Sequence, residues 1–423
     1  MKPSDLKFAK LFAGSGAVTL VNAIRAFAIN KLLAIFLPPA AFACVGQFLN
    51  LMSIGTATSS LALQNGWTAL TAQNKNSKEK LLGIWRGGLR LTTFASLFTF
   101  VAALLFCFMA PLDTLLPGIP TRLAQAAILF ALPGIFATNI ITITAAVMNG
   151  LDENRKWATI NIASSIWQVL WVAFFLFTGR LSVLSIIATQ SIVAAFFAIR
   201  IASQAGFSVK HIWKAALDTR RPWLSYALMG LVPMALTPVV LTVMRLTVAS
   251  NFGNDAAGIW QSIWKVSDFL FMAMSAILTV IILPKVSPKM SRTDFFGMFH
   301  PVWLRVMGIS LVMIATLYFG RSLLVQVLFS SAYMGAVDYL PLQLVGDFFR
   351  AGGYALALVL IARAETVKFI TVEICSEIFL SVGTLVGVKL VDFNGPMLAY
   401  ATENFLYLVT LYILVRRLKW NTP

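Results

Sequence analysis

The residues best suited to chemistry are ionisable side chains inside long apolar stretches. In the run 258–284, Lys265 and Asp268 lie three residues apart and share a face if the run is a helix. A charge near the centre of a bilayer costs roughly 2.5–3.5 kcal/mol, so such groups normally face a protein interior or a wet cavity. The run therefore predicts a pathway through a membrane, with a structural ion pair between two helices as the alternative. The stripe at helical spacing comprises Gln261, Lys265, Asp268, Met272, Ser275 and Thr279.

A second stripe of the same kind lies in the run 339–362. Asp347 and Arg350 are again three residues apart, so we expect the two charges to neutralise each other. The members of this stripe are Gln343, Asp347, Arg350 and Tyr354.

Carboxyl groups of the second half suggest proton transfer. Glu373 and Glu377 lie four residues apart, an unfavourable spacing if both are ionised, so one of them is expected to hold a proton. For Glu377 we favour the alternative that it lies near the lipid interface or pairs with Lys368 or with another helix. The candidate proton-coupling residues are Asp268, Glu373 and Glu403.

Cations at membrane depth are unevenly neutralised along the chain. All acids of the first half fall in loops or at the terminus, so Arg25 and Lys31 have no acid at membrane depth in their own half. A buried cation without a counter-charge is costly, and the usual solution is an anion that visits the site. Arginine suits phosphate because its planar group donates two parallel hydrogen bonds, and lysine adds a point charge.

The sequence therefore predicts a water-filled, net-positive cavity for an anionic substrate. Its cationic residues are Arg25, Lys31, Arg245, Lys265 and Arg350. The polar residues expected to line it and tune its charge are Asn22, Gln47, Gln261, Asp268, Gln343 and Asp347. Two alternatives stay open at this point. Arg25 could pair with Glu373 or Glu403, and the side chains of Lys31 and Arg245 could extend to lipid headgroups.

The elements that position these residues are membrane helices. Of 423 residues, 59% are hydrophobic and only 12% are charged, about half the share of a soluble domain. The sequence contains no Ser/His/Asp, zinc-ligand or Walker-type set, so neither an enzyme nor a cofactor is predicted. Apolar runs predict an all-α integral membrane protein with about twelve spans. The spans are roughly 11–36, 39–63, 84–110, 123–148, 158–178, 183–204, 223–249, 258–283, 300–320, 339–362, 369–390 and 396–415.

The net charge of +17 reflects topology. Most Lys and Arg residues outside the spans fall on the side that holds both termini, which the positive-inside rule assigns to the cytoplasm. The opposite loops carry only Arg122, Arg180, Arg321 and Lys389. The expected partner is therefore the lipid bilayer, and a nucleic acid is not predicted.

The chain divides into two six-helix halves, 1–205 and 222–423. The connector 206–221 has the apolar and basic faces of a helix that lies on a membrane surface. The spacing from Lys31 to Gln47 equals that from Arg245 to Gln261, which suggests parallel repeats about an axis along the membrane normal. Repeat transporters bind their substrates between such halves.

Several motifs resemble a known family. They are GIWQ at 258–261, Ser267–Asp268, Leu283–Pro284, QLVGD at 343–347, Arg350 and IARA at 361–364. With them the chain resembles Wzx-type flippases, in particular the enterobacterial-common-antigen (lipid III) type, in the polysaccharide-transport branch of the MOP exporter superfamily.

This resemblance implies a V-shaped pair of six-helix bundles in the bacterial inner membrane. It also implies transport of an undecaprenyl-pyrophosphate-linked oligosaccharide to the periplasmic face, with Wzy polymerase and a chain-length regulator as further partners. The family's cationic cavity carries over by motif onto Lys31, Arg245 and Arg350, whereas Arg25 and Lys265 fit only by the stripe argument.

Two other functions compete with the flippase. A MATE-like small-molecule or multidrug exporter of the same superfamily would need acids in the first bundle, where this sequence has none at membrane depth. A glycan polymerase or glycosyltransferase would need a large periplasmic loop or a catalytic set, and the longest such loop, about 321–338, carries only Arg321 and Asp338 as charged residues.

Overall fold

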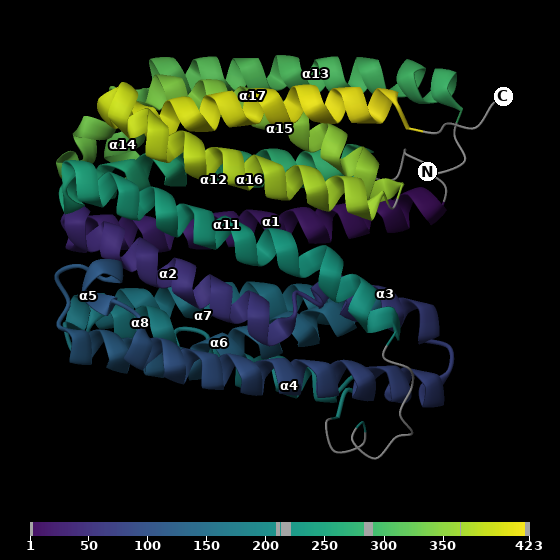
Figure 1. The fold of residues 1–423 in the computed structure, drawn as a ribbon. Helices are drawn as coiled ribbons and strands as arrows, with labels where there is room; N and C mark the ends of the chain where they lie inside the picture. The colour runs from purple at the N-terminus through teal and green to yellow at the C-terminus, as the bar shows by residue number, and fades with distance from the viewer. Residues whose placement is uncertain (1–2, 209–211, 213–220, 283–290, 364, 419–423) are drawn as a thin grey trace. The chain divides into compact units, whose positions relative to one another are not determined.

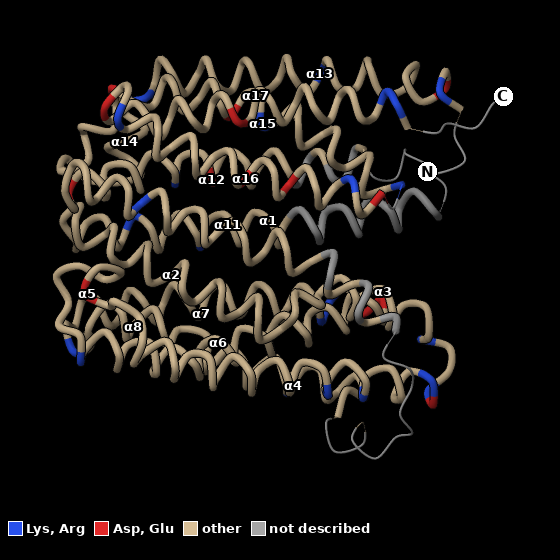
Figure 2. Tube along the Cα trace, in the orientation of Figure 1, with Lys and Arg blue, Asp and Glu red and all other residues tan. Residues whose placement is uncertain are grey.

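The computed structural model describes all residues except 1–2, 209–211, 213–220, 283–290, 364 and 419–423. Within the described residues the chain is almost entirely helical (Figure 1). Lys, Arg, Asp and Glu lie mostly toward the helix ends, and long stretches between them contain none of these four residue types (Figure 2). This pattern is required of helices that cross a bilayer, because their backbone groups are satisfied internally while charged side chains stay in water.

The expected all-helical membrane fold is confirmed. Eleven helical segments in the described residues are long and apolar enough to span a membrane. The remaining expected span, 258–283, corresponds to helix α12, which is described only in part and is not among the eleven.

The chain forms two compact units. Unit 1 comprises Met1–Leu32 and Val45–Pro238, and unit 2 comprises Leu33–Cys44 and Val239–Pro423. The division at 206–221 stays a prediction, and the amphipathic helix expected there falls mostly outside the described residues.

Unit 1 contains most of the helices that come first in the chain. They are α1 (Pro3–Phe36), α2 (Pro39–Ser60), α3 (Gln64–Asn74), α4 (Lys78–Met109), α5 (Leu112–Leu115), α6 (Thr121–Gly150), α7 (Asn154–Thr178), α8 (Val183–Thr189), α9 (Ile192–Ser203) and the first part of α11 (Arg221–Phe252). The core of this unit includes the buried rings of Trp67, Trp85, Phe207 and Trp223, which meet edge to face.

Unit 2 is built around a central helix. Its elements are α12 (Asn254–Ile282), α13 (Arg292–Phe319), α14 (Arg321–Leu328), η2 (Ser331–Ala336), α15 (Leu340–Ala362), α16 (Thr366–Leu390), η3 (Asp392–Asn394) and α17 (Gly395–Arg416), with the end of α11. Helix α15 packs against α12, α13, α16 and α17, and most of its side chains are buried. Hence α15 can carry polar groups far from lipid.

Two expected spans are interrupted. The expected span 39–63 ends at Ser60, where Leu61 and Ala62 adopt positive φ, and a separate helix α3 follows in what was expected to be a loop. Burial of Trp67 in the core of unit 1 accounts for this extra helix. The expected span 183–204 is likewise two helices, α8 and α9, separated by a turn at 190–191.

The turn between α1 and α2 packs within unit 2. Tyr333 donates a hydrogen bond of 3.0 Å from its hydroxyl to the carbonyl oxygen of Leu37. The backbone N–H of Ala40 donates to the Asp255 carboxylate at 3.1 Å. Gly258 approaches Pro39 so closely that an added Cβ would lie 2.0 Å from the Pro39 carbonyl oxygen. These contacts explain why Leu33–Cys44 belongs to unit 2 although α1 and α2 lie mostly in unit 1.

Candidate functional site

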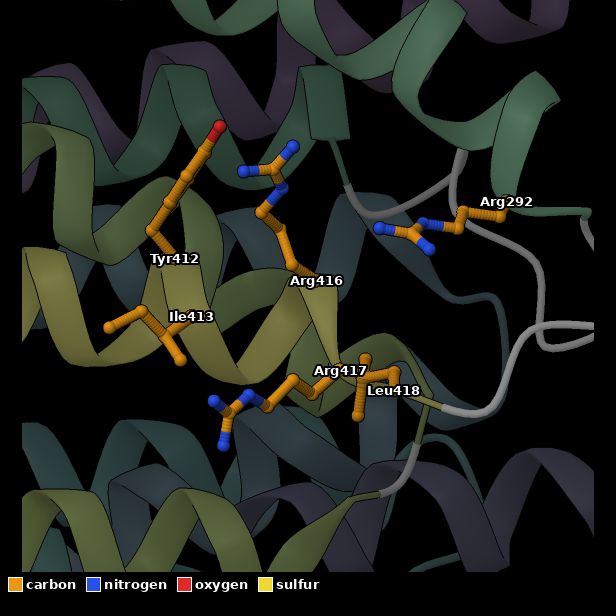
Figure 3. Close-up of a pocket in the computed structure, with 6 residues that line it drawn as sticks. All are labelled: Arg292, Tyr412, Ile413, Arg416, Arg417 and Leu418. Atoms are coloured by element: carbon orange, nitrogen blue, oxygen red, sulfur yellow. The ribbon is translucent and has the colours of Figure 1, made fainter.

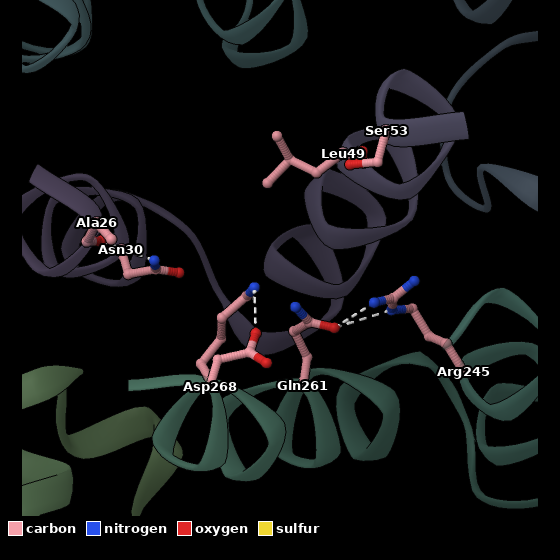
Figure 4. Close-up of polar contacts among 8 residues, drawn as sticks. Ala26, Asn30, Leu49, Ser53, Arg245, Gln261 and Asp268 are labelled. Carbon is pink, nitrogen blue, oxygen red and sulfur yellow. Dashed lines mark hydrogen bonds and ion pairs between the residues drawn. The ribbon is translucent and has the colours of Figure 1, made fainter. Parts of the chain in front are cut away.

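Arg245 is a buried cation held by an uncharged amide. Its side chain comes from α11 and is only 4% exposed. Its Nε donates to Gln261 Oε1 at 3.1 Å and a second guanidinium nitrogen donates to the same oxygen (Figure 4). The guanidinium also lies 5.6 Å from the centroid of the Trp260 ring, a cation–π contact. The structure thus joins two of the predicted site residues, Arg245 and Gln261.

Lys265 and Asp268 form an ion pair along the same helix, with 3.0 Å between Lys265 Nζ and Asp268 Oδ2 (Figure 4). The two side chains are 24% and 37% exposed. Because both belong to α12, the pair does not lock two helices together as the structural alternative supposed. It reduces the charge that Lys265 offers to an anion.

Ser267 makes a polar contact between α12 and α15. Its hydroxyl donates to Asp347 Oδ2 at 2.9 Å and accepts a hydrogen bond of 2.9 Å from the amide of Gln343. Asp347, which is 4% exposed, also accepts from the Tyr400 hydroxyl at 2.8 Å. Two donors therefore satisfy this buried carboxyl group.

The expectation that Asp347 and Arg350 neutralise each other stays a prediction. Among the ion pairs of the described residues the two do not form a direct one, because the Tyr400 hydroxyl lies between the two groups and accepts a hydrogen bond of 3.3 Å from Arg350 Nη1. The Arg350 guanidinium also lies 3.7 Å from the centroid of the Phe271 ring. Arg350 is thus connected to Asp347 through a phenol, and its planar face is covered by an aromatic ring.

Tyr400 is positioned by close packing of α15 against α17. A Cβ added to Gly346 would lie 2.4 Å from the Tyr400 ring. The glycine of the QLVGD motif therefore allows the ring to reach Asp347, one residue further along α15.

Two more carboxyl groups lie between α16 and α17. Glu373 accepts a hydrogen bond from the Tyr407 hydroxyl, and Glu403 accepts one from the Ser376 hydroxyl. Arg350 attracts both carboxylates electrostatically, and Glu377 repels both. This part of unit 2 therefore gathers several acids around one arginine.

Unit 1 has a different charge distribution. Arg25 of α1 donates to Gln168 Oε1 of α7 at 2.8 Å. One turn earlier, Asn22 accepts a hydrogen bond of 2.7 Å from Ser165. The amide of Gln168 continues the polar line to Ser191, at 3.4 Å. The partner that α7 offers to Arg25 is thus neutral.

The acids of unit 1 lie away from this polar line. Among its described side chains they are found in the first turn of α4, in the short helix α5, and between α6 and α7, as Glu79, Asp113, Asp152 and Glu153. Lys31 is half-buried near the end of α1, and Gln47 is fully buried in α2. The described membrane interior of unit 1 therefore carries cations and neutral polar groups.

Sequence reasoning missed four hydroxyl groups as site residues: Ser267, Ser376, Tyr400 and Tyr407. The two on α17 were open to detection, because Tyr400 and Tyr407 lie three residues before and four residues after the predicted Glu403 and so share its face. Among the described residues no cluster of His, Cys, Asp and Glu has a metal-binding arrangement. What the arrangement can do chemically is hold anions and exchange protons.

Comparison with known proteins places these features in a family context. No protein-family model matches the chain. Two curated proteins named lipid III flippase, from Escherichia coli (strain K12) and Shigella flexneri, are each 24% identical over 378 residues, which is 87% of this chain and 88% of the relative. The resemblance found in the sequence motifs is thereby confirmed.

Solved structures share the fold. A multidrug resistance MATE family transporter of the MOP superfamily, in an inward-facing conformation, matches with a TM-score of 0.75 at 13% identity and covers 94% of each chain. A MATE structure in complex with MaD5 matches with a TM-score of 0.66, also at 13% identity and 94% coverage of each chain. The chain therefore has the fold of MOP-superfamily transporters.

Proposed function

We propose that this chain is a flippase for an undecaprenyl-pyrophosphate-linked oligosaccharide, a repeat unit of O-antigen or enterobacterial common antigen. It carries this lipid from the cytoplasmic to the periplasmic face of the bacterial inner membrane by alternating access. Both termini lie in the cytoplasm, as the distribution of loop cations indicates. The likeness to lipid III flippases over 87% of the chain supports this assignment.

The observation that carries the proposal is the environment of Arg25. This arginine lies within a membrane helix, is half-buried, and donates to the neutral side chain of Gln168. A guanidinium in such surroundings retains donors for a ligand, and a pyrophosphate supplies the matching acceptors and charge.

Arg245 and Arg350 are the anion-binding arginines of unit 2 in this proposal. Gln261 orients Arg245 without removing its charge, and Tyr400 does the same for Arg350 while connecting it to Asp347. Lys31 adds a point charge, and Lys265 contributes less because Asp268 pairs with it. The amide side chains expected to contact the sugar or the phosphate are Asn22, Gln47, Gln261 and Gln343.

Protons are the coupling ion that the carboxyl groups favour. Glu373 and Glu403 each accept from a hydroxyl and share the electrostatic influence of Arg350. An anion that approached Arg350 would compete with these carboxylates for its charge, so substrate binding would favour their protonation. Asp268, already paired with Lys265, would take part in the same exchange. Wzy polymerase and a chain-length regulator are the proposed partners that use the translocated lipid.

A MATE-like exporter of small cationic molecules is the second candidate, because MATE transporters share this fold. Fold alone does not identify a substrate, which depends on the site. The interior of unit 1 gives a cationic drug no described carboxylate at membrane depth, whereas it does give an anion Arg25. The flippase is therefore favoured.

Export of enterobacterial common antigen tests the proposal, in a strain that lacks its own lipid III flippase. The wild-type chain should restore the surface antigen, and Arg25→Gln should reduce it at least tenfold, the effect expected when a charged hydrogen bond of about 1.5–3 kcal/mol is lost. Arg25→Lys should retain part of the activity. Arg200→Gln, an exposed charge in the last turn of α9, is the matched control and should act like wild type.

Membrane amounts of each variant must be equal by immunoblot for the comparison to count. If Arg25→Gln, Arg245→Gln and Arg350→Gln all restore the antigen fully, the anion-binding argument fails. If the wild-type chain instead exports a cationic dye and leaves the antigen absent, the MATE-like alternative holds.

A further inference from the structure

A strongly basic pocket lies at one end of unit 2, outside the site described above. It has a volume of about 620 Å³ and is lined by Arg292, Tyr412, Ile413, Arg416, Arg417 and Leu418 (Figure 3). Arg292 starts α13, whereas the other lining residues come from the last turn of α17 and the residues after it. The pocket thus joins the beginning of one membrane span to the end of another.

In the part of the chain that the structure describes, no acid pairs with the three arginines. Arg416 lies 5.4 Å from the Tyr412 ring centroid and Arg292 lies 6.0 Å from that of Phe296, and these contacts hold the side chains without reducing their charge. The acid nearest in sequence to Arg292 is Asp294, whose carboxylate accepts a hydrogen bond of 2.6 Å from the Ser291 hydroxyl. The backbone N–H of Asp294 donates to Ser291 Oγ at 3.2 Å, so Ser291 caps the helix.

Position and apolar contacts favour a lipid as the ligand. The candidate membrane span Arg292–Phe319 begins at this pocket and the span Asp392–Arg416 ends there, so we expect the pocket to lie at a membrane surface. Ile413 lines it and is 44% exposed, so it can contact an acyl chain beside the charged group. Basic pockets between membrane helices at a bilayer surface bind anionic headgroups in this way.

We propose that this pocket binds the phosphate of an anionic phospholipid headgroup, with the three guanidinium groups as donors and Ile413 beside the acyl chain. The site is separate from Arg25, Arg245 and Arg350, so the inference does not depend on the proposed transport activity. Its occupant would anchor the ends of α13 and α17 at the membrane surface.

Native mass spectrometry of the full-length protein in detergent tests this inference. The probes are dioleoyl phosphatidylglycerol, dioleoyl phosphatidylcholine and, by calorimetry, inorganic phosphate alone. The pocket variant is R292Q/R416Q/R417Q. Its matched control is K80Q/R155Q/R200Q, which removes three exposed charges elsewhere.

The wild-type protein should bind phosphatidylglycerol about tenfold more tightly than phosphatidylcholine. The pocket variant should lose about a hundredfold of that affinity and the control variant less than about twofold, since each basic residue near a membrane surface adds about fivefold. Arg417→Gln alone, an exposed change, should lose about fivefold and serves if the triple variant does not fold. Ile413→Ser should weaken the binding of phosphatidylglycerol and leave the binding of inorganic phosphate unchanged.

Three results would overturn the proposal. The pocket variant could bind phosphatidylglycerol as wild type does. The control variant could lose as much affinity as the pocket variant, which would indicate general surface charge. Inorganic phosphate could bind as tightly as phosphatidylglycerol with no effect of Ile413→Ser, which would identify a site for free phosphate instead of lipid.

Discussion

Gly258 illustrates how a single residue of the GIWQ motif is determined by packing. Its Cα faces the backbone of Pro39, and an added Cβ would lie 2.0 Å from a carbonyl oxygen that cannot move independently. The motif glycine is therefore required for the start of α12 to approach the start of α2.

Gly258→Ala should therefore destabilise the protein by about 1–3 kcal/mol, the usual effect of overpacking. Thermal unfolding in detergent, followed by tryptophan fluorescence, measures the change. Gly308→Ala is the control, because an added Cβ there meets no atom within 4 Å and alanine favours a helix. Equal melting temperatures for Gly258→Ala and the wild type would contradict the close approach.

Tyr400 connects two charged groups that the sequence spacing places on one face of α15. Tyr400→Phe should lower stability by about 1–3 kcal/mol, because the buried carboxyl of Asp347 loses a donor. It should also reduce antigen export, since Arg350 loses the hydroxyl that orients it. Tyr318→Phe, on the exposed side of α13, is the control for both measurements. An unchanged export rate would show that Arg350 does not need this contact.

Residue spacing alone could not reveal this arrangement. The positions of Asp347 and Arg350 on α15 correctly predicted that both share one face, because that follows from helix geometry. Whether they touch depends on Tyr400, which is fifty residues away in sequence and reaches them only through the contact at Gly346. The ion pair Lys265–Asp268, in contrast, was predictable because both partners lie on one helix.

At the scale of elements, the hydrogen bond from Tyr333 to Leu37 fixes the end of α1. Burial raises the pKa of the Tyr333 hydroxyl well above its usual value, and the nearby Asp255 carboxylate raises it further. A group whose pKa is higher in the folded state contributes stability that is complete below its unfolded pKa, about 10 for tyrosine, and is lost as the pH rises above that value. The contact is therefore insensitive to pH in the neutral range.

Tyr333→Phe should destabilise the protein by about 1 kcal/mol, and by the same amount at pH 6 and pH 9. The melting temperatures of the variant and the wild type, measured at both pH values, check this expectation. A difference between variant and wild type that shrinks markedly from pH 6 to pH 9 would mean that the hydroxyl ionises in the folded protein.

The positions of the spans were predictable, because an apolar run of about 20 residues with charged ends is determined by composition. The breaks inside two of them were not. The separation of α8 from α9 accompanies a close approach in which a Cβ on Gly134 would lie 1.7 Å from the Ala188 carbonyl oxygen. Helix α3 depends in the same way on the buried site of Trp67. Both breaks result from tertiary contacts, which a hydropathy pattern does not reveal.

For the whole molecule, the proposed function predicts a bound lipid. The protein purified from a strain that makes the antigen should retain undecaprenyl-pyrophosphate oligosaccharide, detected by mass spectrometry of the extracted lipids. Arg25→Gln should reduce the retained amount at least about tenfold through the loss of its charged contact. Arg200→Gln should not. If Arg25→Gln and Arg200→Gln retain equal amounts of this lipid, Arg25 is not needed to bind it.

The chain passes between the two units at three places, after Leu32 in α1, after Cys44 in α2 and after Pro238 in α11, and each lies within a helix. A helix resists bending because every turn is closed by hydrogen bonds. A change in the angle between the units would therefore have to bend a helix at each of these crossings. Helix α11 is the most compliant of the three, since Pro233 and Pro238 each remove a backbone donor near its crossing. Mechanical compliance at Pro238 would then set how readily the transporter changes conformation.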